Sequence, residues 1–286
     1  MNKFLIYLFL KINKVFPHKY HPFDDLKNGM SDMNYTDFEY SHCKDLLNQY
    51  KDFMNLEELK GKKILEIWCG WWWKIVYISE KYQCNAIGID LNLHFLDQAE
   101  EKAKKHQVEN NVKFLEMDAL NMQFKDNEFD YVLMSDVLEH IPKTDILMKE
   151  SLRVLKKWWK ILFDFAPYYH YFGHHMWDTI QIPWLHIFTT EKFRVDLYKK
   201  SVEKLPDSHK RINLRIWKDK NWSESFTYLN RLTRKQFENI IQEWEQMWSF
   251  KNCTIKYFML KNISIFWYIP VLRETFIRHI VWVIVK

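Results

Sequence analysis

The sequence is poor in glycine, with 5 glycines against 14 tryptophans, although ordinary usage predicts about 20 glycines in a chain of 286 residues. Cysteine is also rare, and the four cysteines form neither a CxxC pair nor a zinc-site spacing, so we expect no disulfide framework and no bound metal. No apolar run reaches the roughly 18 residues that a membrane span needs. The net charge of +5 is spread along the chain, which argues against a nucleic-acid partner. These absences favour a cytoplasmic protein with a packed core.

Short apolar runs alternate with helical patterns along the chain. Apolar residues at helical spacing between 46 and 59 predict a helix ahead of the first strand. The predicted strands are residues 64–67, 85–89, 112–117, 131–134, 161–165, 254–260 and 280–285. This alternation predicts an α/β fold with a doubly wound, Rossmann-like, mostly parallel seven-stranded sheet and helices on both faces.

The same patterns divide the chain into four parts. A helical cap at 1–60 precedes the core at 61–166, and an aromatic, histidine-rich insertion at 167–232 is expected to form a lid for substrate recognition. Residues 233–286 supply a helix and the closing strands of the same domain. Within the cap, the apolar run at 4–10 predicts an amphipathic helix that covers a core edge, with peripheral membrane contact as the alternative.

An acidic residue lies at the end of each of the first three predicted strands. The loop EIWCGWWW at 66–73 comes after the first strand, where ligands bind in doubly wound sheets. Asp90 ends the second strand and can accept hydrogen bonds from a ribose diol. Asp118 ends the third strand, where a side-chain oxygen can meet an adenine amino group. The three strand ends therefore predict one nucleoside site.

Residues 62–165 resemble the class I S-adenosylmethionine-dependent methyltransferases, specifically the type 11 branch. In the family motif ExGxGxG, Glu66 and Gly70 match, whereas Trp68 and Trp72 stand where glycines belong. Asp90 matches the ribose-binding acid of the family.

Three later landmarks extend the resemblance. Asp118 with Ala119 matches the adenine-contact position, and FDYVLMSDVLEHI at 129–141 resembles the fourth-strand motif. LRVLKKWWKILF, which begins at Leu152, resembles the LRVLKPGG turn before the fifth strand. The resemblance implies a methyltransferase with S-adenosyl-L-methionine as cofactor, bound by Glu66, Trp68, Gly70, Trp72, Asp90, Leu91, Asp118, Ala119 and Ser135.

Two other functions compete with methyl transfer. An acid after the second strand also suits a nicotinamide-dependent oxidoreductase, but the loop lacks the third glycine of that fingerprint. A non-catalytic module that kept the fold and lost the cofactor is supported only by the tryptophans in the loop. The acids at Glu66, Asp90 and Asp118 argue against such a module.

Tryptophan at the family's glycine positions conflicts with a backbone that must bend and approach a ligand closely. We interpret these tryptophans as glycines, from a gene in which UGA encodes glycine but has been translated as tryptophan. The family motifs identify Trp68, Trp72, Trp158 and Trp159 as such positions. Further candidates are Trp71, Trp73, Trp217, Trp222, Trp248 and Trp282, whereas Trp177 and Trp184, in sequence without turn character, are expected to be true tryptophans.

The methyl acceptor is expected to be a small organic or lipid-like molecule, because the insertion is rich in aromatic residues that can enclose one. Its predicted substrate residues are Tyr168, His170, Asp178 and His186. No catalytic residue is assigned, because an activated methyl group needs no dedicated base; the candidates for one are His140, His174 and His175. His170 and His174 are four residues apart, but no third ligand completes a metal site. Nothing in the sequence indicates an oligomeric state.

Overall fold

The computed structural model describes residues 3–16, 40, 42–67, 73–91, 96–218, 223–226, 229–248, 252–259 and 277–286. Contacts divide the chain into two compact units. The sheet unit comprises Thr36–Phe165, Lys235–Phe258 and His279–Lys286, and the helical unit comprises Met1–Tyr35, Ala166–Arg234 and Met259–Arg278. The predicted roles of the sequence segments as cap, core and lid stay predictions, because contacts do not show what either unit binds.

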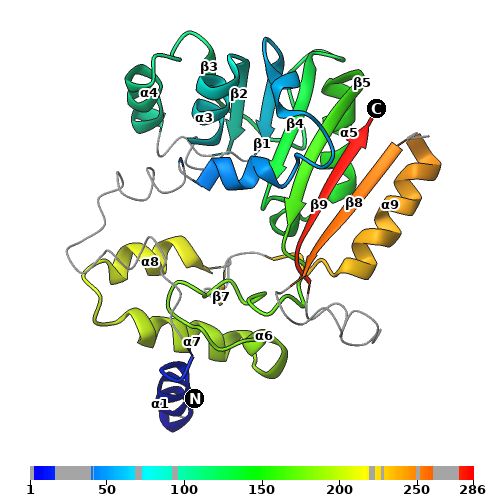
Figure 1. Ribbon diagram of the computed structural model, residues 1–286. Coiled ribbons are helices and arrows are strands. Elements are labelled where there is room, and N and C mark those ends of the chain that lie inside the picture. The colour runs from blue at the N-terminus through cyan, green and yellow to red at the C-terminus, as the bar shows by residue number, and fades with distance from the viewer. Residues whose placement is uncertain are drawn as a thin grey trace. The chain divides into compact units, whose positions relative to one another are not determined.

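The sheet unit is built on seven strands, as the sequence predicts (Figure 1). They are β1 (Lys63–Ile67), β2 (Asn85–Asp90), β3 (Val112–Glu116), β4 (Phe129–Ser135), β5 (Leu155–Phe165), β8 (Asn252–Met259) and β9 (Ile277–Val285), in the order β3-β2-β1-β4-β5-β9-β8. Strands β1 to β5 pair in parallel, and β9 pairs with β5 antiparallel. Every residue of β4 is buried, as expected for a central parallel strand covered on both faces. The predicted doubly wound α/β fold is confirmed.

Helices cover both faces of this sheet. They are α3 (Trp73–Tyr82), α4 (Leu96–Lys105), α5 (Thr144–Val154) and α9 (Arg234–Trp248), with short 3-10 turns η2 (Leu56–Leu59) and η3 (Leu138–His140). Tyr131 and Leu133 of β4 pack in one cluster with α3, whereas the next side chain, Met134, lies 4.0 Å from the Ser151 hydroxyl group of α5. Because successive side chains of a strand point to opposite faces, α3 and α5 lie on opposite sides of β4.

The predicted helix at 46–59 is wrong in its limits. Helical structure ends at Asn48, turns follow, and η2 supplies the last four residues. Leu47, Tyr50 and Met54 are nevertheless buried in the core. The apolar spacing therefore identifies which side chains are buried, although turns connect these residues in place of a continuous helix.

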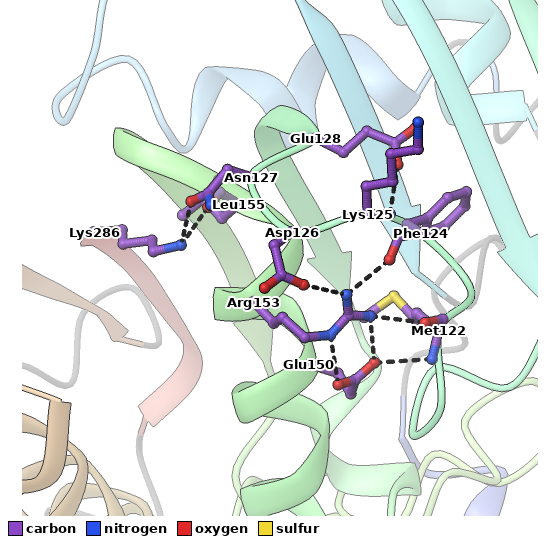
Figure 2. A network of polar contacts seen from close by, with 10 residues as sticks. All are labelled: Met122, Phe124, Lys125, Asp126, Asn127, Glu128, Glu150, Arg153, Leu155 and Lys286. Carbon is purple, nitrogen blue, oxygen red and sulfur yellow. Dashed lines mark hydrogen bonds and ion pairs between the residues drawn. The ribbon is translucent and has the colours of Figure 1, made fainter.

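Arg153 of α5 fixes the connection between β3 and β4 (Figure 2). Its guanidinium group donates to the carbonyl groups of Met122 and Phe124, both at 2.7 Å, and to the Asp126 carboxylate at 2.9 Å. It also binds the Glu150 carboxylate through two hydrogen bonds of 2.8 and 2.9 Å. The planar fork of arginine matches this set of acceptors, which an ammonium group cannot reproduce.

The helical unit contains α1 (Lys3–Asn13), α6 (Leu185–Phe188), α7 (Glu191–Val202), α8 (Ser208–Arg215) and a two-stranded antiparallel ribbon of β6 (Ile216–Lys218) and β7 (Glu224–Phe226). The rings of Phe9 in α1 and Phe193 in α7 lie 5.0 Å apart, edge to face. Asn13 donates to the Thr179 carbonyl group and accepts from the Gln181 backbone amide. In the part of the chain described, no helix is long and apolar enough to cross a bilayer.

Among the described residues, two tryptophans adopt the left-handed backbone conformation that favours glycine. Trp158 has a φ of 71° and lies in β5, where the pairing register with β4 shifts. Trp184, with a φ of 54°, immediately precedes α6. The prediction that Trp184 lacks turn character is therefore wrong. The aromatic residues around it in the sequence give no indication of its left-handed backbone conformation.

Candidate functional site

Glu66 lies in β1, Asp90 ends β2, and Asp118 lies in the connection after β3. These three strands are neighbours in the sheet. Since the strands are parallel, their carboxyl ends meet at one edge of the sheet. Glu66 is completely buried, Asp90 is nearly so, and Asp118 is exposed. The Met117 amide donates to the Asp90 carbonyl group at 2.9 Å, and the Leu120 amide donates to the Asp118 carboxylate at 2.8 Å. The first bond holds the chain after β3 beside the end of β2, and the second is local to the loop after β3.

Lys74, at the start of α3, places its ammonium group 3.6 Å from the Glu66 carboxylate. This pair joins β1 to the helix that follows it. Leu91, directly after β2, is 66% exposed, and Ala119 is half-buried. The predicted loop residues Trp68, Gly70 and Trp72 lie outside the described residues.

A buried polar cluster lies at the carboxyl ends of β4 and β5. The Asp164 carboxylate accepts a 2.6 Å hydrogen bond from the Tyr50 hydroxyl group and a 3.1 Å bond from the Ser135 hydroxyl group. Burial raises the pKa of Tyr50, and the carboxylates of Asp164, Asp136 and Glu66 raise it further. Tyr50 therefore stays protonated and donates.

Sequence reasoning found Ser135 in this cluster but missed both of its partners. Asp164 was detectable as the only acid in the apolar run ILFDF. Tyr50 carried no comparable signal, because its position matches the apolar core pattern of the segment before β1.

In the helical unit, Tyr168, His174 and His186 line one cavity of about 290 Å³. The rings of Tyr168 and His186 lie 4.9 Å apart. Gly173 also lines the cavity, and a Cβ atom there would lie 2.0 Å from the Tyr168 carbonyl oxygen, so this position requires glycine. The structure thus brings together two predicted substrate residues and one predicted catalytic candidate.

The two cavity histidines are neutral. Burial and, to a smaller degree, the nearby His186 lower the pKa of His174 to about 3. His174 Nδ1 accepts from the Met176 amide at 3.0 Å, so Nε2 carries the proton and donates to the Ile182 carbonyl group at 3.1 Å. Burial lowers the pKa of His186 to about 4, opposed by the backbone of Tyr168.

The other predicted residues occupy separate positions. Asp178 is buried and accepts from the Tyr198 hydroxyl group at 2.9 Å and from the Arg211 guanidinium group at 3.2 Å. His170 is buried against aromatic rings, and His175 is half-buried in a left-handed backbone conformation. His140 ends η3 in the sheet unit. Functional roles for these four residues stay predictions.

Comparison with known proteins finds methyltransferases. Residues 64–158 match the family model described as "Methyltransferase domain". Demethylmenaquinone methyltransferase from Geobacillus sp. (strain WCH70) is 34% identical over 111 residues, covering 38% of this chain and 46% of the relative. The Staphylococcus carnosus (strain TM300) enzyme of the same name is 30% identical over 148 residues, covering 51% and 56%. The chain therefore spans about half the length of these curated relatives.

Among solved structures, geranyl diphosphate C-methyltransferase from Streptomyces coelicolor A3(2) is similar with a TM-score of 0.51 and 10% identity. The match covers 89% of this chain and 81% of that chain. At this identity the similarity establishes a shared fold.

Proposed function

We propose that the chain is an S-adenosylmethionine-dependent methyltransferase acting on a small organic or lipid-like acceptor, because residues 64–158 match the methyltransferase domain family. The observation that carries this proposal is the placement of Glu66, Asp90 and Asp118 at the carboxyl ends of three adjacent parallel strands. Two of these carboxylates are buried, which is costly for charged groups unless partners hold them.

The residues of this edge fit a nucleoside cofactor. Asp90 would accept from the ribose hydroxyl groups, and Asp118 would contact the adenine. Glu66 and the Tyr50–Asp164–Ser135 cluster would form the buried floor of the site. When bound, S-adenosylmethionine supplies an activated methyl group. The chain contributes orientation and exclusion of water, which account for much of the rate of such a displacement.

A small-molecule acceptor is supported by the names of the relatives. They include methyltransferases of demethylmenaquinone, norajmaline and phosphoethanolamine. The comparisons give no support to a nicotinamide-dependent oxidoreductase or to a module without cofactor. Cys43 and Cys84 are buried free thiols, which favours a reducing cytoplasm.

The test is calorimetric titration of S-adenosylhomocysteine into the chain as printed and into a restored chain with glycine at 68, 71, 72, 73, 158 and 159. Only the restored chain is expected to bind, because glycine lets the loop approach the ligand. Within the restored chain, Asp90→Ala should weaken binding at least about tenfold, since the buried acceptor of two hydroxyl groups is lost. Asp97→Ala removes an exposed acid from α4 and serves as the matched control. If neither chain bound S-adenosylhomocysteine, the proposal would be contradicted.

We also propose that α1 contacts membranes peripherally. Ile6, Phe9 and Leu10 pack against the helical unit, whereas Phe4 and Val15 are 68% and 80% exposed. Exposed lysines at 3, 11 and 14 complement anionic headgroups. Sedimentation with vesicles containing phosphatidylglycerol tests this, with Phe4→Glu expected to reduce binding.

Phe188→Glu is the control for this membrane test, because Phe188 is 79% exposed but lies in α6. Equal losses in both variants, or equal binding of the unaltered chain to neutral phosphatidylcholine vesicles, would contradict contact through α1.

A further inference from the structure

The cavity of the helical unit contains more positive than negative charge. Besides Tyr168, Gly173 and the two neutral histidines, Arg194, Arg231 and Glu191 line it. Two guanidinium groups against one carboxylate leave one positive charge in excess among the lining residues.

Arg194 carries the stronger part of this argument. It is only 8% exposed, and among the described residues no carboxylate lies within 4.0 Å of its guanidinium group. Both hydrogen bonds that it makes there use Nη1, to the carbonyl oxygens of Thr189 at 2.6 Å and His186 at 3.4 Å. With respect to the described residues, the N–H groups of Nε and Nη2 therefore stay available to a ligand. A buried arginine remains charged, so an anion beside it would offset part of its desolvation.

Arg231 supplies a second cation at the same cavity. Its side chain is 60% exposed and lies 3.6 Å from the Glu191 carboxylate, longer than an ordinary hydrogen bond. Burial lowers the pKa of Arg194, Tyr168 and Glu191 raise it, and the positive charge of Arg231 lowers it by a smaller amount. The two guanidinium groups thus repel each other, and an anion between them would remove that repulsion.

The remaining lining is uncharged and combines the rings of Tyr168, His174, His186 and Phe226 with Gly173, Ser225 and Leu229. Phe226 is 4% exposed, and the Tyr168 and His186 rings are in edge-to-face contact. A volume of about 290 Å³ admits a ligand about the size of one substituted ring.

We propose that this cavity binds a small aromatic or apolar molecule through its carboxylate or phosphate group, held by Arg194 and Arg231. Identifying this molecule as the methyl acceptor rests on the proposed function; the binding itself does not. Together with the proposed function, this cavity would restrict the methyl acceptor to organic anions.

Calorimetric titration of the full chain with benzoate, phenyl phosphate and benzyl alcohol tests the proposal. At least one anion should bind about tenfold more tightly than the neutral alcohol, and comparison of the two anions separates carboxylate from phosphate recognition. Equal binding of benzyl alcohol, or no binding of either anion, would overturn the inference.

Substitutions of Arg231 and Arg194 test whether these two arginines bind the anion. Arg231→Gln should weaken anion binding about fivefold or more, and because Arg231 is exposed, its replacement leaves the fold intact. Arg194→Gln should weaken anion binding further, but it also removes the hydrogen bond to the Thr189 carbonyl group. Arg194→Lys, which keeps the positive charge, is therefore measured beside it. Lys192→Gln removes an exposed cation from the same helix and does not line the cavity. Unchanged binding in Arg231→Gln, or an equal loss in Lys192→Gln, would contradict the assignment.

Titration of S-adenosylhomocysteine into the glycine-restored chain separates this inference from the proposed function. Cofactor binding without anion binding overturns only the cavity assignment. Anion binding without cofactor binding overturns the methyltransferase proposal and leaves an anion-binding cavity.

Discussion

The Tyr50 hydroxyl group donates a 2.6 Å hydrogen bond to the Asp164 carboxylate, across 114 residues of sequence. Both side chains are almost completely buried. The bond ties the segment before β1 to the carboxyl end of β5. It also satisfies a carboxylate that would otherwise be costly to bury.

Tyr50→Phe is expected to lower the free energy of unfolding by about 1–3 kcal/mol, because the variant leaves the buried carboxylate short of one donor. Urea denaturation measures the change. Tyr77→Phe is the control, since Tyr77 is half-buried in the same core and its hydroxyl group makes no hydrogen bond to a described residue. A change of equal size in both variants would show that the Asp164 contact contributes nothing specific.

Arg153→Lys is expected to lower the free energy of unfolding by about 2 kcal/mol. Lysine keeps the charge but loses the fork that reaches Met122, Phe124 and Glu150 together (Figure 2). Lys149→Met, at an exposed position of the same helix, is the control and should change stability by less than about 0.5 kcal/mol. If Arg153→Lys left the free energy of unfolding unchanged, the positive charge alone would be sufficient to hold the β3–β4 connection.

The sequence was sufficient to predict the sheet because its strands are continuous apolar runs separated by helices. The acids at 66, 90 and 118 were equally visible, since each lies at the end of such a run. Contacts between distant segments were not visible. The hydrogen bond between Tyr50 and Asp164 depends on how the chain folds back. Arg194 and Arg231 lie far apart in the sequence, among many other basic residues. The left-handed backbone of Trp184 was hidden because tryptophan does not indicate a turn.

Acid is expected to destabilise the protein through His174 and His186. Their folded-state pKa values, about 3 and about 4, lie below the ordinary 6.5, so the unfolded chain binds protons more readily. The stability that these neutral rings contribute is therefore complete above pH 6.5 and is lost as the pH falls toward 4. Each ring adds a slope of up to about 1.4 kcal/mol per pH unit in that window.

Urea denaturation of His186→Gln between pH 7 and 4.5 tests this linkage. The variant should show a shallower loss of stability than the unaltered chain, because one titrating ring is absent. His209→Gln removes an exposed histidine and controls for changes unrelated to burial. Identical pH slopes for His186→Gln and the unaltered chain would contradict a neutral, buried His186.

Trp158→Gly is expected to stabilise the protein by about 1 kcal/mol, although it removes a large side chain. Trp158 is 65% exposed, so little packing is lost, and its φ of 71° is a conformation that glycine adopts without the steric cost of a Cβ atom. The relief of strain outweighs the greater entropy of glycine in the unfolded chain.

Trp217→Gly is the matched control for this substitution. Trp217 is 59% exposed and lies in β6, without a positive φ, so the backbone gives no reason for glycine at this position, although the sequence interpretation included it among the further glycine candidates. Glycine there should destabilise by about 0.5–1 kcal/mol, because an extended position gains nothing from glycine's freedom. Opposite signs for the two variants would identify position 158 as a glycine site by its backbone, in agreement with the reading of its codon as glycine. Destabilisation in both would show that the tryptophan at 158 is accommodated and would weaken that interpretation for the whole set of motif tryptophans.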